Sequence, residues 1–393
     1  MRPVSSGATA NTRLVPLRTV VREWTRIGVT GFGGPPAHIA MLRKLVVEQK
    51  AWMSAEEFQD ANAAVGLLPG PTSTQLAIFC AYRSGGPLGA IVGGLGFVVP
   101  AVALMLLLSP VFLAHAPPLW VRGAGAGAGA AVAAVAAQAA RGLIVPSWQS
   151  VRASHKPHQL RWVLYIAASA VTAATLGPYL VLVLVGCGAF EVLATRPRTP
   201  SRTTLVLLPA KTVAVGGYGA LAWTAFKIGA LAFGGGFVIV PLMQDTAVHV
   251  YHWMTNAQFL SAVALGQITP GPVVATVAAV GYAAHGLLGA TIASLIAFAP
   301  SFSFVLIGGA RFNRLRNNAS ARAFLDGAGP AAIGAILGGA VLLGTAVHFA
   351  WQVGVLGAAA VALLVFNRGV VSVLLSAGVI GVVAALAGAP LPR

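Results

Sequence analysis

The stretch LLPGPTSTQL, residues 67–76, interrupts a segment that otherwise has the composition of a membrane helix. The same interruption recurs in QITPGPVVAT, residues 267–276. Proline lacks a backbone N–H and cannot sit inside a helix without the loss of a hydrogen bond. Irregular backbone at membrane depth persists only where protein or a water-filled cavity satisfies it. The two breaks therefore predict discontinuous helices that line a cavity.

The composition around these breaks is that of a protein that crosses a membrane many times. Of the 393 residues, 57% are hydrophobic and only 8% are charged, whereas soluble proteins carry about 25% charged residues. Three stretches, 88–108, 124–140 and 370–387, are long enough, or nearly so, to cross a bilayer core of about 30 Å. The first 30 residues have arginines and no apolar core, so a cleavable signal is not expected.

The charge balance argues against a cation transporter. The chain has 25 Lys and Arg against 8 Asp and Glu, a formal charge of +17. Basic residues collect in cytoplasmic loops, which accounts for much of this excess, and the alternative is a field that attracts anions. Cation transporters place carboxylates at mid-membrane, and only Asp60 is expected within a membrane segment. Cys80 and Cys187 are far apart in apolar segments, so we expect neither a disulfide, a metal site nor a cofactor.

The chain consists of two copies of one unit. Phe32-Gly33-Gly34 recurs 201 residues later as Phe233-Gly234-Gly235, and Trp52-Met53 recurs as Trp253-Met254. At the same spacing, the first Pro-Gly-Pro meets the second. We therefore predict an N-terminal transporter repeat at 1–200 and a C-terminal repeat at 201–393, joined by the Pro-rich basic linker TRPRTPSRTT (195–204).

Loop charges predict that the second repeat is inverted relative to the first. Three pairs of matched loops carry opposite bias, for example SPVFLAHAPPLW without Lys or Arg against a counterpart with Arg311, Arg314 and Arg316. Inverted repeats are a common transporter design. The expected fold is an all-α polytopic membrane protein with two homologous halves in inverted topology. It has about ten transmembrane helices, five to a half, with broken or re-entrant segments. Basic residues at 13–26 argue for a cytoplasmic N-terminus, in which case segment 27–42 re-enters the membrane instead of crossing it.

The residues after each break are suited to binding an anion. A helix that starts at Thr72 presents free N–H groups and a partial positive charge, and so does one that starts at Val273. In inverted repeats the two breaks meet near the midplane, where transporters keep their substrate site. The alternative is that Pro-Gly-Pro only kinks a packed helix. The candidate residues here are Pro69, Gly70, Pro71, Thr72, Ser73, Thr74 and Gln75, with Pro270, Gly271 and Pro272.

Further candidates lie near the breaks, each with an alternative role. The glycines of the Phe-Gly-Gly motifs allow close approach to a ligand or tight helix packing. A basic residue precedes each motif and either holds an anion or extends to the membrane interface. Five polar side chains are candidate hydrogen-bond donors. The glycines are Gly33, Gly34, Gly234 and Gly235, the basic residues are Arg26 and Lys227, and the donors are His38, Asn62, Gln75, Gln267 and Thr269.

Together these motifs identify a known family. GFGGPPAHIAML, LLPGPTSTQLAIFCAYRSGG and FGGGFVIVPLMQ, followed by QITPGPVVATVAAVGY, strongly resemble the chromate ion transporter family in its long form of two fused halves. The resemblance covers most of residues 18–390. It implies a multi-pass exporter of chromate in the bacterial inner membrane that confers chromate resistance, with sulfate as a related oxyanion. Half two departs from half one, because Ile239 replaces His38 and Thr276 replaces Gln75.

Three other functions stay open beside chromate export. The first is a sulfate or general oxyanion importer or exchanger of the same architecture, because sulfate and chromate share shape and charge. The second is a membrane-embedded chromate reductase, but the chain lacks a dinucleotide fingerprint and a CxxC motif, so we expect no enzyme. The third is a channel. The partners expected are chromate, sulfate and lipid, without nucleic acid, and a homodimer is a prior for symmetric assemblies.

Overall fold

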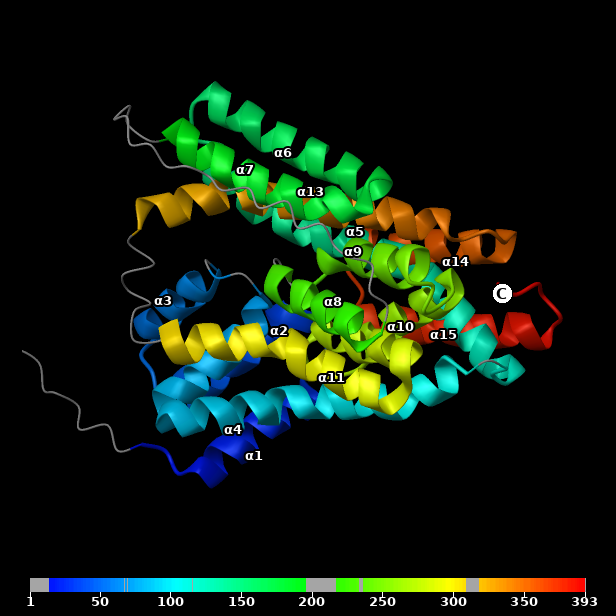
Figure 1. The fold of residues 1–393 in the computed structure, drawn as a ribbon, viewed down its shortest axis with the longest axis horizontal. Helices are drawn as coiled ribbons and strands as arrows, with labels where there is room; N and C mark the ends of the chain where they lie inside the picture. The colour runs from blue at the N-terminus through cyan, green and yellow to red at the C-terminus, as the bar shows by residue number, and fades with distance from the viewer. Residues whose placement is uncertain are drawn as a thin grey trace, which may run out of the picture.

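The computed structural model describes residues 14–66, 68, 70–114, 116–195, 217–232, 236–308 and 318–392, and all regular elements within these ranges are helices (Figure 1). Half one comprises α1 (Leu17–Thr30), α2 (Gly34–Arg43), α3 (Ala55–Gly66), α4 (Thr72–Phe112), α5 (Leu119–Val151), α6 (Lys156–Thr175) and α7 (Leu180–Thr195). Half two comprises α8 (Tyr218–Leu231), α9 (Ile239–Gln244), α10 (Asn256–Ile268), η5 (Val273–Thr276), α11 (Val277–Gly308), α13 (Ala319–Thr345), α14 (Ala350–Ala360) and α15 (Val370–Leu386).

The lengths and composition of these helices confirm a membrane protein. Four described segments are long and apolar enough to cross a membrane, and they are Thr72–Phe112, Leu119–Val151, Val273–Gly308 and Ala319–Thr345. Shorter apolar helices follow in both halves at Leu180–Thr195, Ala350–Val365 and Val370–Leu386. Large apolar side chains such as Leu88, Leu107 and Leu295 are exposed on the outside of these helices, where a bilayer would cover them.

The helices α4 and α11 are each folded into two arms. In α4 the backbone leaves helical geometry at Gly85 and Gly86, the latter with φ +69°. A Cβ on Gly89 would lie 2.6 Å from the carbonyl oxygen of Ala81, so the arms lie side by side. We call 72–84 the first arm of α4 and 87–112 its long arm. Likewise α11 bends at His285 and Gly286, which divides it into a first arm, 277–284, and a long arm, 287–308.

The two halves repeat each other in backbone detail. A π-helix at Lys44–Gln49 is matched by one at Asp245–Val250. Each is followed by a residue with left-handed backbone, Ala51 at φ +49° and His252 at φ +51°. Such a backbone is uncommon outside glycine, so its recurrence is specific. The predicted architecture of two homologous halves is therefore confirmed, whereas the predicted boundary at residue 200 lies outside the described residues and stays a prediction.

The halves are interlocked. Helix α5 of half one packs against α14 and α15 of half two, while α13 of half two packs against α6 and α7 of half one. Glycines make the closest crossings, for Gly127 meets the carbonyl oxygen of Ala377, and its counterpart Gly327 meets that of Cys187. Without a hydrophobic driving force between helices in lipid, small residues that permit such contact are what holds a bundle together.

Equivalent helices of the two halves cross in opposite directions. The colours of Figure 1 show the long arms of α4 and α11 running oppositely, and α5 and α13 likewise. The two long arms also touch, since a Cβ on Gly94 of α4 would lie 2.5 Å from the ring of Phe302 of α11. A two-fold axis parallel to the helices would keep equivalent helices parallel. The observed arrangement is compatible with the predicted inverted repeat, and the inverted topology itself stays a prediction.

The glycine crossings yield a test with an internal control. Gly127→Ala would place a Cβ 2.1 Å from the Ala377 carbonyl oxygen, whereas Gly142 of the same helix has no atom within 4 Å of its Cβ position. Crowding costs about 1–3 kcal/mol, and alanine in an open helical position gains about 0.5–1 kcal/mol over glycine. Thermal unfolding in detergent should show a lower midpoint for Gly127→Ala and an unchanged or higher one for Gly142→Ala. Equal midpoints would contradict the interlocked packing.

Candidate functional site

Gly70 and Pro71 of the first Pro-Gly-Pro lie at the tip of a helical hairpin. Arg83, at the end of the first arm of α4, forms an ion pair with Glu57, at the start of α3. These residues can meet only if α3 and the first arm run back alongside each other. We call this pair of helices, 55–84, hairpin one. Its tip includes Gly70, whose φ of +121° favours glycine, and Pro71, after which α4 begins at Thr72 as expected.

The second Pro-Gly-Pro has the same position in half two. Helix α10 ends at Ile268, and the 3-10 turn η5 begins at Val273, directly after Pro272. The chain folds back here too, because the Thr276 hydroxyl lies against Gly266, on the other side of the tip. Gly271 at this tip has φ +101°. We call 256–284 hairpin two.

Hairpin two reaches into half one beside the middle of the long arm of α4. The Gly271 N–H donates to the Gly31 carbonyl oxygen at 3.0 Å, directly after α1 ends. A Cβ on Gly271 would lie 2.8 Å from Cβ of Ala101, which is buried near the middle of the long arm of α4. Position 271 therefore requires a glycine for two reasons, the positive φ of its backbone and the lack of space for a Cβ beside Ala101. The tip therefore lies beside the middle of this long arm, far from either of its ends.

Hairpin one reaches into half two in the same way. A Cβ on Gly70 would lie 3.3 Å from the carbonyl oxygen of Gly229, in α8. Gly229 in turn packs against the carbonyl oxygen of Ala297, near the middle of the long arm of α11. Each tip therefore inserts into the opposite half, beside the centre of the long arm of that opposite half. Since these long arms cross each other, with Gly94 against Phe302, both tips lie beside the crossing.

His38 joins the second tip from half one. Its Nε2 lies 2.8 Å from the Gly31 carbonyl oxygen, the same oxygen that accepts the Gly271 N–H. A carbonyl oxygen only accepts, so Nε2 carries a proton. The ring packs edge-on against Phe97, with 5.0 Å between centroids. His38 is fully buried, and its Nδ1 has no hydrogen-bond partner among the described residues.

Polar groups at both tips are buried and unsatisfied. Neither Pro71 nor Pro272 is accompanied by a side chain that caps the helix after it, as far as the described residues show. The Thr74 hydroxyl, in the first turn of α4, is fully buried without a hydrogen-bond partner in the described ranges. The same holds for Nε2 of the buried Gln267, just before the second tip. Unsatisfied buried donors are rare and call for an explanation, of which an absent ligand or water is one.

Other candidates lie in the hairpins or beside them. Gln75 is buried, and its Nε2 lies against Gly70. Thr269 is buried too, and its hydroxyl is 3.4 Å from the Gly266 carbonyl oxygen. Gly33 and Gly34 have φ of +101° and +71°, and they turn the chain from α1 into α2. Ser73 and Pro270 are buried, and Thr72 and Asn62 are half-buried.

The basic candidates do not join these groups. The Arg26 side chain is 56% exposed and forms an ion pair with Glu23 at 3.1 Å. Lys227 lies over the ring of Trp223, 5.9 Å from its centroid. Both arrangements are compatible with the alternative role, in which Arg26 and Lys227 extend to the membrane interface. Pro69, Gly234 and Gly235 lie outside the described residues, as do Arg311, Arg314 and Arg316.

The comparisons with known proteins agree with the geometry. Residues 18–192 and 219–382, one segment from each half, match the family model described as Chromate transporter. The chain belongs to the chromate transporter family. It is similar to the chromate transport protein of Cupriavidus metallidurans, with 31% identity over 363 residues and 87% of each chain covered. No solved structure matches the chain.

Two further relatives bear similar names. The probable chromate transport protein of Synechococcus elongatus is 30% identical over 344 residues, with 84% of each chain covered. The chromate transport protein of Pseudomonas aeruginosa is 31% identical over 359 residues, with 84% of this chain and 83% of the relative covered. The resemblance drawn from the motifs is therefore confirmed, as is a multi-pass membrane protein of this transporter family.

One buried acid escaped the sequence analysis, which singled out Asp60. In this chromate transporter family member, Glu191 of α7 is fully buried. Arg161 donates to both carboxylate oxygens at 2.9 Å, and the Tyr165 hydroxyl donates at 2.7 Å. The signal was a single glutamate within the apolar run LVLVLVGCGAFEVLAT, because such a residue needs a cationic partner on a neighbouring helix. Asp60 itself is half-buried in α3.

The hairpin can be tested by exchanging its terminal ion pair. Arg83→Glu should place two carboxylates together and lower the thermal midpoint, and Glu57→Arg should do the same with two cations. Exposed pairs contribute about 0.2–1 kcal/mol, so each shift should be small. The double exchange should restore the midpoint in detergent. If α3 and α4 ran end to end instead, these residues would be far apart, and the double variant would show the sum of two independent effects.

Proposed function

We propose that this chain exports chromate from the bacterial cytoplasm across the inner membrane and thereby confers chromate resistance. The anion binds where the tips of hairpins one and two approach the crossing of the long arms. The observation that carries the proposal is the reciprocal insertion of the tips, Gly70 against Gly229 and Gly271 against Gly31, beside the centres of long arms in the opposite half. A midplane site between inverted repeats is the usual arrangement in secondary transporters.

The chemistry of the tips suits a tetrahedral oxyanion. Two helix starts present backbone N–H groups and the positive ends of helix dipoles. Thr74 adds a buried hydroxyl that lacks a partner among the described residues, and the unpartnered Nδ1 of His38 becomes a further donor when the imidazole is protonated. Such donors can share four oxygens without a full countercharge from the protein. Weak binding of this kind permits release, which a cage of arginines would hinder.

To complete a transport cycle, the anion site must open first to one side of the membrane and then to the other. Each tip is held by the opposite half, so movement of one half against the other changes both contacts at once. We propose alternating access by such rocking, with the halves in inverted topology. In a cell with an inside-negative potential, export of an anion gains about 2.3 kcal/mol per charge per 100 mV, so membrane potential alone is sufficient to drive a dianion outward.

Chromate and sulfate have the same shape and charge, and the donors at the tips do not distinguish them. A sulfate importer or exchanger would use the same site. Flux of labelled chromate into inverted membrane vesicles, with and without excess sulfate, separates these functions. Energised uptake supports export, whereas chromate accumulation in right-side-out vesicles supports import and would overturn the proposed direction.

The tip glycines provide the principal test. Gly70→Ala and Gly271→Ala should each abolish most chromate flux, since both tips contribute to one site. Gly86→Ala is the matched control, because Gly86 also has positive φ, +69°, but no atom within 3.6 Å of its Cβ position. All three variants incur backbone strain of about 1 kcal/mol or more. If Gly86→Ala impairs flux as severely as the other two, strain and not the site explains the losses.

His38 is tested by a replacement that keeps its packing. His38→Phe retains an aromatic ring against Phe97 and removes both ring nitrogens. Hydrogen bonds to charged groups contribute about 1.5–3 kcal/mol, so the chromate concentration for half-maximal flux should rise roughly tenfold or more. Ile239→Phe changes the equivalent position of half two and should have a smaller effect on this concentration. Unchanged half-saturation in His38→Phe would reduce His38 to a packing residue.

A further inference from the structure

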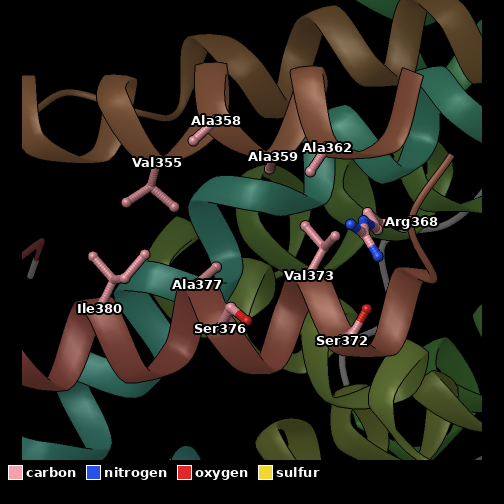
Figure 2. A pocket seen from close by; sticks show the side chains of 10 residues that line it. All are labelled: Val355, Ala358, Ala359, Ala362, Arg368, Ser372, Val373, Ser376, Ala377 and Ile380. Carbon is pink, nitrogen blue, oxygen red and sulfur yellow. The ribbon is translucent and has the colours of Figure 1, made fainter. Parts of the chain in front are cut away.

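A groove between α14 and α15 lies outside the site described above. Figure 2 shows α14 on one side and α15 on the other, with side chains of both helices directed into the space between them. The groove has a volume of about 320 Å³. Along most of its length its walls are apolar and include Val355, Ala359, Ala377 and Ile380. It exists because alanines face each other across the gap and leave room that larger side chains would fill.

One end of the groove is polar and positively charged. Arg368 and Ser372 line this end, and Figure 2 shows the Arg368 guanidinium beside it. The backbone N–H of Arg368 donates to the Ala362 carbonyl oxygen at 2.9 Å, and this hydrogen bond fixes the turn that carries the side chain. Within the described ranges Arg368 forms no ion pair. An unpaired guanidinium at the end of an apolar groove suits a ligand that has both an anionic group and a hydrocarbon part.

A second arginine lies near the same end. Arg141 of α5 donates to the carbonyl oxygen of Leu364, and Gln138 donates to that of Leu363 at 3.4 Å. These carbonyls belong to the π-helix Val361–Val365 that continues α14. Arg141 uses one of its five N–H donors in this contact, so its positive charge adds to that of Arg368. The charged end is thus built by two elements and held by hydrogen bonds.

We propose that this groove binds one anionic phospholipid, with an acyl chain between α14 and α15 and the phosphate on Arg368. The apolar walls match a hydrocarbon chain, and the guanidinium matches a phosphate. A free oxyanion would leave these walls uncovered, and a second copy of the chain would have to bury Arg368 against an acid. The site is particular to half two, because the corresponding turn of half one, LGPYL at 176–180, has no basic residue. The proposal is independent of the transported substrate.

Native mass spectrometry of delipidated protein tests this directly. The probes are phosphatidylglycerol and phosphatidylcholine with identical acyl chains, and inorganic phosphate. Phosphatidylglycerol should bind with a stoichiometry of one and more tightly than phosphatidylcholine. Arg368→Gln should weaken it about fivefold, the effect of one basic side chain worth about 1 kcal/mol beside an anionic headgroup. Arg122→Gln, which changes an exposed arginine near the other end of α5, should not weaken it.

A second variant fills the apolar part of the groove. Ile380→Trp should reduce retention of both phospholipids, and because Ile380 is half exposed, the protein should still fold. Equal binding of the two lipids, or binding unaffected by Arg368→Gln and Ile380→Trp, would overturn the proposal. If the unmodified protein has the mass of a dimer and Ile380→Trp has the mass of a monomer, the groove is a homodimer interface and the proposal is overturned. A phosphate adduct lost in Arg368→Gln, without lipid retention, would also overturn it.

Discussion

The structure depends on the requirement that every backbone polar group at membrane depth has a partner. The two Pro-Gly-Pro segments break their helices where no lipid or bulk water can replace the lost hydrogen bonds. At the second tip the opposite half supplies the partner, since the Gly31 carbonyl oxygen accepts both the Gly271 N–H and the His38 Nε2–H. The Gly271 N–H of half two thus depends on half one for its hydrogen-bond partner. The broken helices and the interlocked fold are therefore two aspects of one constraint.

The two halves agree in backbone and differ in side chains. The π-helices, the left-handed residues after them and the bends of α4 and α11 recur at equivalent positions. At the tips, however, His38 corresponds to Ile239, and Gln75 corresponds to Thr276. A symmetric scaffold thus holds an asymmetric set of donors. In the proposed function, this asymmetry lets one half contribute most of the side-chain contacts while both contribute backbone.

Much of this architecture could be predicted from the sequence, because its determinants are local. Pro-Gly-Pro at 69–71 and 270–272 fixes helix breaks, and the spacing of the Phe-Gly-Gly and Trp-Met pairs reveals the repeat. The interlocking could not be predicted, because the match of Gly127 to Ala377 depends on which helices become neighbours. For Arg26 the sequence left an anion site and an interfacial position open, and the ion pair with Glu23 is visible only in the structure. Glu191 was overlooked, since its partner Arg161 is 30 residues away in sequence.

The central claim is that both hairpin tips serve a single anion. The most direct measurement is the number of chromate ions bound per chain, by equilibrium dialysis of labelled chromate against purified protein. The account predicts one ion per chain, with binding lost when either tip is altered. Two ions per chain, each removed by a change in only one half, would show that the halves hold separate sites and would contradict the account.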